Sequence, residues 1–511
     1  MDPGLSIAAS GLQASMTQID VATENIANAQ TPGYIAESAQ LAEVPGGGTL
    51  GVGAGVQVTT VAQLTDAMLS ANNLQAQGAV SSAGALQQVL TGIENVFPLG
   101  QSSTSSSATT STSSSIAGQL SSFWSAWDAI TQDPSALAPR TQVVDMAQGL
   151  VTSLSEASTQ LTQLQQNTSS QIGTDVAQAN TLLSQAASLN GSIIESSGGG
   201  ASPNQLEDQL SNVVSQLASL AGVNVTMQQN GTAQVSIGGI TVVQGSQADT
   251  LSTDPPQGYT PPAGQPTPWT TVFAYPSAAA ASSQAADGVA APVTGGALAG
   301  LLQGVNVSIP QYEQQLNGVA NDLANTVNTQ LAQGYDAAGT SGAANPLFEQ
   351  GSSTAGYSTT SPPTYTASGI SLNASVVADP TLIAAASGQT TASVSYANDG
   401  GNAQSMAELG TPSDVARLST TVYGSSSALS SPDQAYQTLV EGIGSLVQNA
   451  NAAVSSQTAV ANQAQQALQA VSGVNQDTQL TDLMQYQANY QASAKVVSVI
   501  DSTIQSLLAA V

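Results

Sequence analysis

The stretch that decides the fold is MDPGLSIAASGLQASMTQIDVATENIANAQTPGY, residues 1–34. Its apolar positions recur at alternating steps of three and four residues, which is the a/d spacing of a coiled-coil helix with one polar exception. A helix with a single narrow apolar stripe is marginal alone, because most helical stability in proteins comes from packing that stripe against a partner. We therefore expect the partner elsewhere in the chain. The seam positions are Leu5, Ala8, Leu12, Ser15, Ile19, Ala22 and Ile26.

A turn is predicted to end this helix. Pro32 has no backbone N–H, and Gly33 can take a positive φ, so the pair is typical of a helix stop. We expect the motif around it to belong to an interface together with the seam. The motif consists of Asn25, Ile26, Ala27, Asn28, Thr31, Pro32, Gly33 and Tyr34.

Charged side chains are scarce and almost all acidic. Only 7% of the 511 residues are charged, against roughly 25% in ordinary soluble domains. Arg140, Arg417 and Lys495 are the only cationic side chains beside 31 acids, which gives a formal net charge of −28. Binding to nucleic acid or to an anionic membrane depends on clustered Lys and Arg, so we expect no nucleic acid and no membrane as partners.

The chain contains no cysteine and no histidine. Thiol nucleophiles, His general bases, disulfides and the usual zinc ligands are therefore excluded, and we expect no cofactor and no metal. No apolar run is long enough to cross a membrane, and the N-terminus lacks the basic and apolar regions of a cleaved secretory signal. If the protein is exported, we expect a route without such cleavage.

The low charge has two interpretations. Most of the 31 acids become neutral near pH 3, since unperturbed carboxyl pKa values lie at about 3.9 to 4.3. With only three cations, the net charge then falls close to zero, which suits an acidic exterior. Compositional drift is the alternative.

Between the termini, periodicity predicts a mostly α chain with inserted β-rich domains. A period of two over residues 223–242, with a turn at Asn230-Gly231, predicts a three-stranded antiparallel meander. A strand is expected near 56–61, the Ser/Thr-rich tract 101–115 reads as a linker, and Gly173 is a possible break in a rod-like helix. Helices are expected at about 64–97, 120–133, 140–193, 206–220, 312–331 and 436–511.

The C-terminal segment carries a second seam at steps of three and four. The simplest way to cover two lone seams is to pair them, with the intervening domains looped out; two separate surface helices on a globular core are the alternative. The seam is Leu483, Tyr486, Tyr490, Ser493, Val497, Ile500, Ile504, Leu507 and Val511. The expected organisation is a terminal pair (1–34 and 475–511), a helical rod (35–197, 300–335 and 426–474), an outer α+β domain (198–299) and a second outer β-containing or loop region (336–425).

Several motifs resemble those of bacterial flagellar axial proteins. Ser10-Gly11-Leu12 and the 25–34 motif are similar to the N-terminal signature that rod, hook and hook-associated proteins share. Further stretches resemble the hook-associated protein 1 family, and the C-terminal one, YQANYQASAK, is the most specific. The chain departs from that family at Asp208-Gln209-Leu210-Ser211, where a charge pair is missing, and in its longer Ser/Thr tract. The matching stretches are 123–127, 133–134, 140–143, 203–209, 328–339 and 486–495.

The resemblance implies a structural protein, not an enzyme, at the junction of flagellar hook and filament. It implies export through the flagellar type III apparatus to the cell exterior, with a cytoplasmic chaperone covering the C-terminal helix until assembly. The implied partners are identical subunits in a ring, the hook protein and the second junction protein. Another axial protein is the nearest alternative.

Two further classes of protein are alternatives to a flagellar structural protein. A secreted adhesin would keep its binding without the termini. A carboxylate hydrolase could use Asp128 and Asp133 beside Trp127, although Trp127 at this helical spacing fits a core better. Asp322 and Asp336 could bind calcium, but they lack EF-hand spacing.

Overall fold

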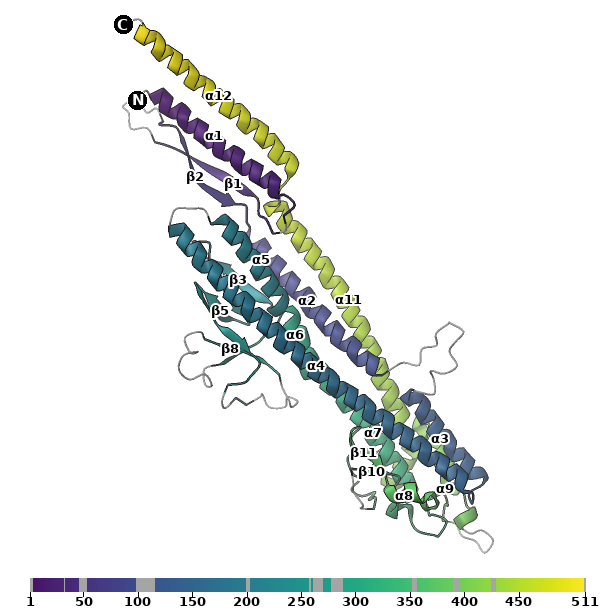
Figure 1. The fold of residues 1–511 in the computed structure, drawn as a ribbon. Coiled ribbons are helices and arrows are strands. Elements are labelled where there is room, and N and C mark those ends of the chain that lie inside the picture. The colour runs from purple at the N-terminus through teal and green to yellow at the C-terminus, as the bar shows by residue number, and fades with distance from the viewer. Residues whose placement is uncertain are drawn as a thin grey trace.

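The computed structural model shows an elongated molecule with both chain ends at one tip (Figure 1). Pro32 and most of the Ser/Thr-rich tract lie outside the described part, so the linker prediction for that tract has no structural counterpart here. The structure describes residues 3–31, 33–45, 53–97, 115–198, 203–256, 259–260, 270–276, 288–351, 356–388, 396–423 and 429–509.

The tip is built from the first and last helices and one hairpin. Helices α1 (Pro3–Asn28) and α12 (Gln476–Ala509) lie side by side and run in opposite directions (Figure 1). Strands β1 (Glu37–Glu43) and β2 (Val56–Gln63) pair antiparallel and pack on α1. The sequence predicted β2 but not β1. Strand β1 is largely exposed, so its side chains carry no clear apolar alternation.

Two long helices lead away from the tip. Helix α2 (Ala67–Val96) packs along α11 (Pro432–Ser472), and Asp66 caps α2 by accepting hydrogen bonds from the backbone N–H groups of Met68 and Leu69. Helix α4 (Leu137–Gly198) then spans 62 residues. The expected break at Gly173 is wrong, because buried Ile172 and Val176 hold the helix on the core and outweigh the helix penalty of glycine, about 1 kcal/mol.

Two small sheets lie against the C-terminal part of α4, around Asn180 and Asn190. Helix α5 (Asn204–Ala221) ends at Gly222, which takes φ +60°, and the predicted meander follows as β3 (Val223–Met227), β4 (Ala233–Ile237) and β5 (Ile240–Gln244), with β6 (Gln247–Ala248) added at the edge. The second sheet was not predicted, because its strands are short and lie far apart in the sequence. They are β7 (Thr250–Ser252), β8 (Val272–Tyr275) and β9 (Val289–Ala291).

The distal end has an aromatic core. Phe123, Trp124 and Trp127 cluster with one another, and Phe348 packs against Phe123. The described part of 336–425, for which a β-containing or loop region is expected, holds one two-stranded ladder and three α-helices. The elements here are α3 (Ile116–Gln132), α7 (Ile309–Ala332), β10 (Phe348–Gln350), β11 (Ile370–Leu372), α8 (Ala374–Ala378), α9 (Gly401–Glu408) and α10 (Pro412–Tyr423). Helix α6 (Gly296–Gln303) and a π-helical turn (Gly304–Ser308) precede α7 and lie nearer the middle of the molecule, where α6 packs on α2 and α5 (Figure 1).

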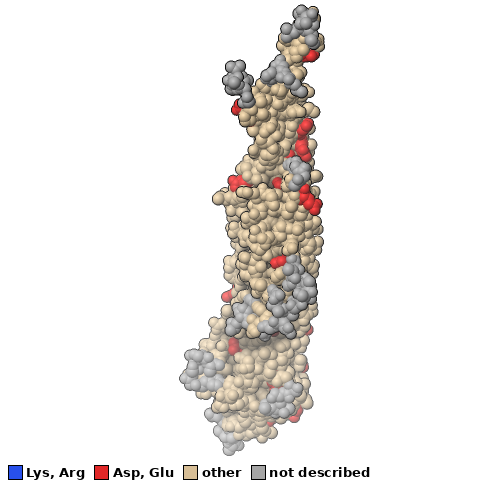
Figure 2. Space-filling model, turned by 90° about the vertical axis from the view of Figure 1, so that its left-hand side faces the viewer, with Lys and Arg blue, Asp and Glu red and all other residues tan. Residues whose placement is uncertain are grey.

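Buried amides connect these parts, because the described residues form few ion pairs and the face shown in Figure 2 carries only scattered acidic side chains among uncharged ones. Asn190, fully buried on α4, donates to the carbonyls of Ala233 and Gly245 and accepts from the N–H of Ala233. Asn180 bonds both backbone groups of Leu251 in the same way. One apolar core runs continuously from α2 to α11, so the division into rod and outer domains stays a prediction. No helix in the described ranges is long and apolar enough to cross a membrane.

Candidate assembly interface

The structure places the two predicted seams at the same tip. On α1, every second seam position is buried (Ala8, Ser15 and Ala22), and the larger residues between them are half-buried. On α12 most seam residues are half-buried, while Tyr490 and Ile504 are more than a third exposed. The half-buried seam positions are Leu5, Leu12, Ile19, Ile26, Leu483, Tyr486, Ser493, Val497 and Ile500; the side chain of Leu507 and all of Val511 lie outside the described residues.

Gly11 allows α1 and α12 to approach closely. A Cβ at this position would lie 3.2 Å from Oγ of Ser493, which leaves room for little more than a methyl group. Gly11 of the Ser10-Gly11-Leu12 motif therefore has a packing role on the α12 side of the helix.

We expect Gly11→Val to weaken this packing, because a branched side chain forces α12 outward. The expected loss is about 1–3 kcal/mol for the terminal unit, the usual cost of overpacking. Protease sensitivity of the terminal helices, followed against urea, measures it. Gly84→Val on α2 is the matched control, since a Cβ there meets nothing within 4 Å. Equal effects of both variants would contradict the packing role.

A second face of α1 contacts the hairpin and was not predicted. Ala14, Val21 and Asn25 are buried on it. Ser10 Oγ accepts a hydrogen bond from the N–H of Val56, and Gly55, at φ +115°, has no room for a Cβ beside Ser10. Residues 14, 21 and 25 form a second helical stripe at steps of seven and four, which is a signal present in the sequence itself.

Asn25 is the centre of the joint beneath the seam. Its side chain is 1% exposed. Its Oδ1 accepts from the N–H of Glu37 (2.9 Å) and the hydroxyl of Tyr34 (2.9 Å), and its Nδ2 donates to the carbonyl of Glu37 (2.8 Å) and to Oε1 of Gln479 (3.1 Å). One amide thus connects α1, the start of β1 and α12.

The rest of the motif shapes the turn after α1. Asn28 donates to the carbonyl of Glu24 and accepts from the Thr31 hydroxyl, and Gly33 has φ +82° with Asn212 of α5 close to where a Cβ would be. The predicted positive φ at Gly33 is therefore present, and Pro32 lies outside the described residues.

Three carboxyl groups meet where the hairpin contacts α5. Asn204 donates to Oε1 of Glu37, and Gln63 donates to Oδ1 of Asp208 at 2.8 Å. Burial, more than any neighbouring charge, raises the pKa of Glu37 and of Glu207, and raises the pKa of Asp208 to about 6. The pKa of Tyr34 is raised too, by burial and then by Glu37. The joint between the tip and the long helices therefore carries negative charge that no cation of the described residues offsets.

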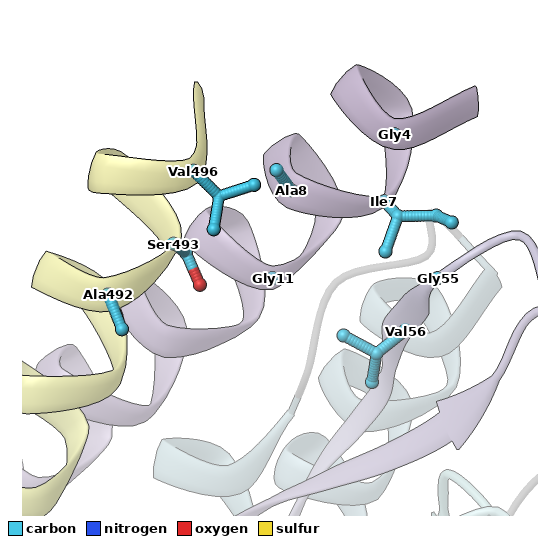
Figure 3. A pocket seen from close by; sticks show the side chains of 9 residues that line it. All are labelled: Gly4, Ile7, Ala8, Gly11, Gly55, Val56, Ala492, Ser493 and Val496. Atoms are coloured by element: carbon cyan, nitrogen blue, oxygen red, sulfur yellow. The ribbon is translucent and has the colours of Figure 1, made fainter. Parts of the chain in front are cut away.

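An apolar hollow of about 550 Å³ opens between α1, α12 and the hairpin (Figure 3). Ile7, Val56 and Val496 point into it from three different elements. Small residues line the remainder and keep it open. They are Gly4, Ala8, Gly11, Gly55, Ala492 and Ser493.

The candidate catalytic and metal groups do not assemble into a site. Trp127 is fully buried in the aromatic core, whereas Asp128 beside it is exposed. Asp336 accepts from the N–H groups of Ala338 and Thr340 in its own loop. Within the described residues, no three acids gather into a group that could hold a metal ion.

Comparisons with known proteins place these features in one family. The family model described as the helical domain of flagellar hook-associated protein FlgK matches residues 103–348. The model of the C-terminal region of flagellar basal body rod FlgEFG proteins matches 464–510, and that of the flagella basal body rod protein matches 5–34.

Individual related proteins indicate the same family as these family models. Flagellar hook-associated protein 1 of Salmonella typhimurium is 30% identical over 342 residues, which cover 66% of this chain and 57% of that protein. The Escherichia coli K12 protein of that name is 29% identical over 342 residues, 66% of this chain and 58% of its own length. The solved structure of the flagellar hook junction protein FlgK from Burkholderia pseudomallei shares the fold, with a TM-score of 0.60 at 20% identity, over 80% of this chain and 100% of that chain.

A helical domain of the hook-associated type between termini of the rod type defines an axial protein of the bacterial flagellum. Within that class, the chain belongs to the family of flagellar hook-associated protein 1. The alignments span a little under three fifths of the length of the two enterobacterial relatives.

Proposed function

We propose that this protein is a structural component of the junction between flagellar hook and filament, and that it assembles through its two terminal helices. The observation that carries the proposal is the tip, where α1 and α12 pack together. Six exposed large apolar side chains lie on α12 alone, which leaves apolar surface for further partners. They are Leu480, Met484, Tyr490, Val496, Val499 and Ile504.

In this proposal the terminal helices form a coiled coil, and their seam and turn residues make the assembly site. The partners are further copies of the chain in a ring, the hook protein on one side and the second junction protein on the other. The distal end, with its aromatic core, points away from the axis.

The apolar surface of α12 also bears on how the protein is exported. An unpaired α12 exposes its seam, so a cytoplasmic chaperone on that helix would keep it from aggregating before export through the flagellar type III apparatus. The mature location is the flagellum outside the cell, reached without cleavage of a signal peptide.

Removal of residues 483–511 is expected to abolish incorporation into the flagellum, because α1 then loses its partner helix. Cells carrying only this variant should secrete filament monomers that fail to polymerise. Electron microscopy of cells and immunoblots of the medium measure both effects. Normal filaments on the deletion strain would overturn the proposal.

A point variant separates assembly from export. Val497→Glu puts a charge into the seam while leaving the rest of α12 in place, and we expect the chain in the medium but not on hooks. The matched control is Val289→Glu, at an exposed position of β9 far from the tip, which should assemble normally. Retention of Val497→Glu inside the cell would show an export defect and leave the deletion result as the test of assembly.

A further inference from the structure

We infer that the outer faces of α1 and α12 bind each other between neighbouring copies of this chain, with Lys495 of one copy paired to Asp20 of the next. The inference rests on the proposed function, since it needs several copies side by side. It concerns the exposed sides of the two helices: on α12 the face opposite the seam, and on α1 the face that lies beside the seam and away from the hairpin.

The outer face of α12 combines apolar groups with one cation. Met484 is 64% exposed and Val499 is 52% exposed, and Lys495 between them is exposed as well. At 100° per residue these three positions fall on one side of the helix, opposite the stripe formed by Tyr486, Ser493 and Val497. Burial of this face against a partner would remove substantial apolar area from water.

The outer face of α1 is complementary in size and charge to the outer face of α12. Met16 is 56% exposed, and Asp20 follows it one turn later on the same side. The exposed positions on this side again recur at steps of three and four, as an interhelical contact requires. They are Gln13, Met16, Asp20, Thr23 and Ala27.

The charge balance of the whole chain points to a pairing between copies. Arg140 is buried and donates to backbone carbonyls, and Arg417 pairs with Glu408 and Asp414. Lys495 makes no ion pair with any described residue. Chains with a net charge of −28 repel one another, so the exposed cation is the group best able to favour one docking register between them.

The register of the contact excludes a pairing within one copy. Inside a copy, Gly11 lies against Ser493, and Asn25 donates a hydrogen bond to Gln479. In this antiparallel register, Met16 lies opposite about residue 488. An antiparallel contact that pairs Lys495 with Asp20 places Val499 against Met16 instead. These two residues are about 16 Å apart along the helix axis within one copy. The contact is therefore heterologous, and its repetition produces a ring or a helical array.

Cysteine cross-linking tests the contact directly, because the chain has no cysteine of its own. Met16→Cys with Val499→Cys should give a ladder of covalent oligomers when isolated flagella are oxidised. A disulfide needs Cα atoms within about 7 Å, so the pair cannot close within a copy. Met16→Cys with Met484→Cys is the matched control on the same two faces, and it should stay monomeric. A stronger ladder from the control would refute the register.

Charge exchange tests the ion pair. Lys495→Glu is expected to lower the amount of chain in isolated flagella about tenfold, and Asp20→Lys in the same chain should restore it to within about twofold. Glu24→Lys, one turn further along α1, should not restore it. Arg417→Glu, which alters a cation far from the tip, should assemble normally.

The outcomes separate this inference from the proposed function. If the unaltered chain is absent from isolated flagella, the proposed function fails. If the unaltered chain is present and Lys495→Glu is incorporated equally well, the contact is refuted while the function stands. Loss with Lys495→Glu that Asp20→Lys does not restore also refutes the pairing, since Lys495 then faces another partner.

Discussion

Asn25→Ala is expected to release the terminal helices from the rest of the molecule. The substitution removes a 1% exposed amide and leaves both backbone groups of Glu37, the Tyr34 hydroxyl and the Gln479 amide without their partner. Each buried group that loses its hydrogen bond costs roughly 1 kcal/mol or more, so we expect the terminal unit to lose about 3–5 kcal/mol. Hydrogen exchange of the α1 and β1 backbone amides measures that loss.

Asn28→Ala is the matched control for this prediction. Asn28 lies one turn later in the same motif, but its side chain bonds only its own turn, to Glu24 and Thr31. Its replacement should cost less than about 1 kcal/mol. Asn25→Asp should resemble Asn25→Ala at pH 7, because a carboxylate accepts hydrogen bonds but cannot donate to the Glu37 carbonyl. If both Asn25 variants behave like Asn28→Ala, the joint does not depend on this amide.

Acidification from pH 7 to pH 4 is expected to stabilise the folded protein. Burial raises the pKa of Asp208 to about 6 and that of Asp322 to about 6, well above the ordinary range of an aspartate. A carboxyl with a raised folded-state pKa binds its proton more tightly in the folded chain. Its stabilising contribution is fully present below the unfolded pKa, near 4, and is lost as the pH rises through about 6.

The magnitude follows from the size of the two pKa shifts. A pKa raised by about two corresponds to roughly 3 kcal/mol of folding free energy per carboxyl group. Partial exposure to solvent reduces this free energy, so we expect a gain of about 2–5 kcal/mol for Asp208 and Asp322 together. Urea unfolding between pH 4 and pH 7 measures the gain. The double variant Asp208→Asn with Asp322→Asn mimics the protonated groups and should flatten this profile. A stability that falls steadily from pH 7 to pH 4 would contradict the prediction.

This pH dependence bears on the unusual composition. Glu37, Glu207 and Glu349 also have a raised pKa because of burial, whereas Asp379 and Asp399 have a lowered pKa through hydrogen bonds they accept. Among the described carboxyl groups with a shifted pKa, those whose pKa is raised outnumber those whose pKa is lowered. We therefore expect the fold to tolerate acid, in keeping with an acidic exterior; drift of the composition is the competing interpretation.

The sequence by itself determined the long helices and the seams of the two terminal ones. Stripes at three and four residue steps over 1–34 and 483–511 depend on local geometry alone, since a helix presents the same face every seven residues. The meander after Gly222 could be predicted from the sequence as well, because period-two alternation and the turn at Asn230-Gly231 are local signals.

Only the tertiary structure decided which surfaces meet. Strand β1, the short strands β7 to β9 and helix α9 have weak local signals, so their conformation comes from the neighbours that cover them. The joint is the clearest case: Asn25, Glu37 and Gln479 lie far apart in the chain, and nothing local predicts that one amide joins them. Periodicity identifies a face that needs a partner, whereas long-range packing and hydrogen bonding select the partner.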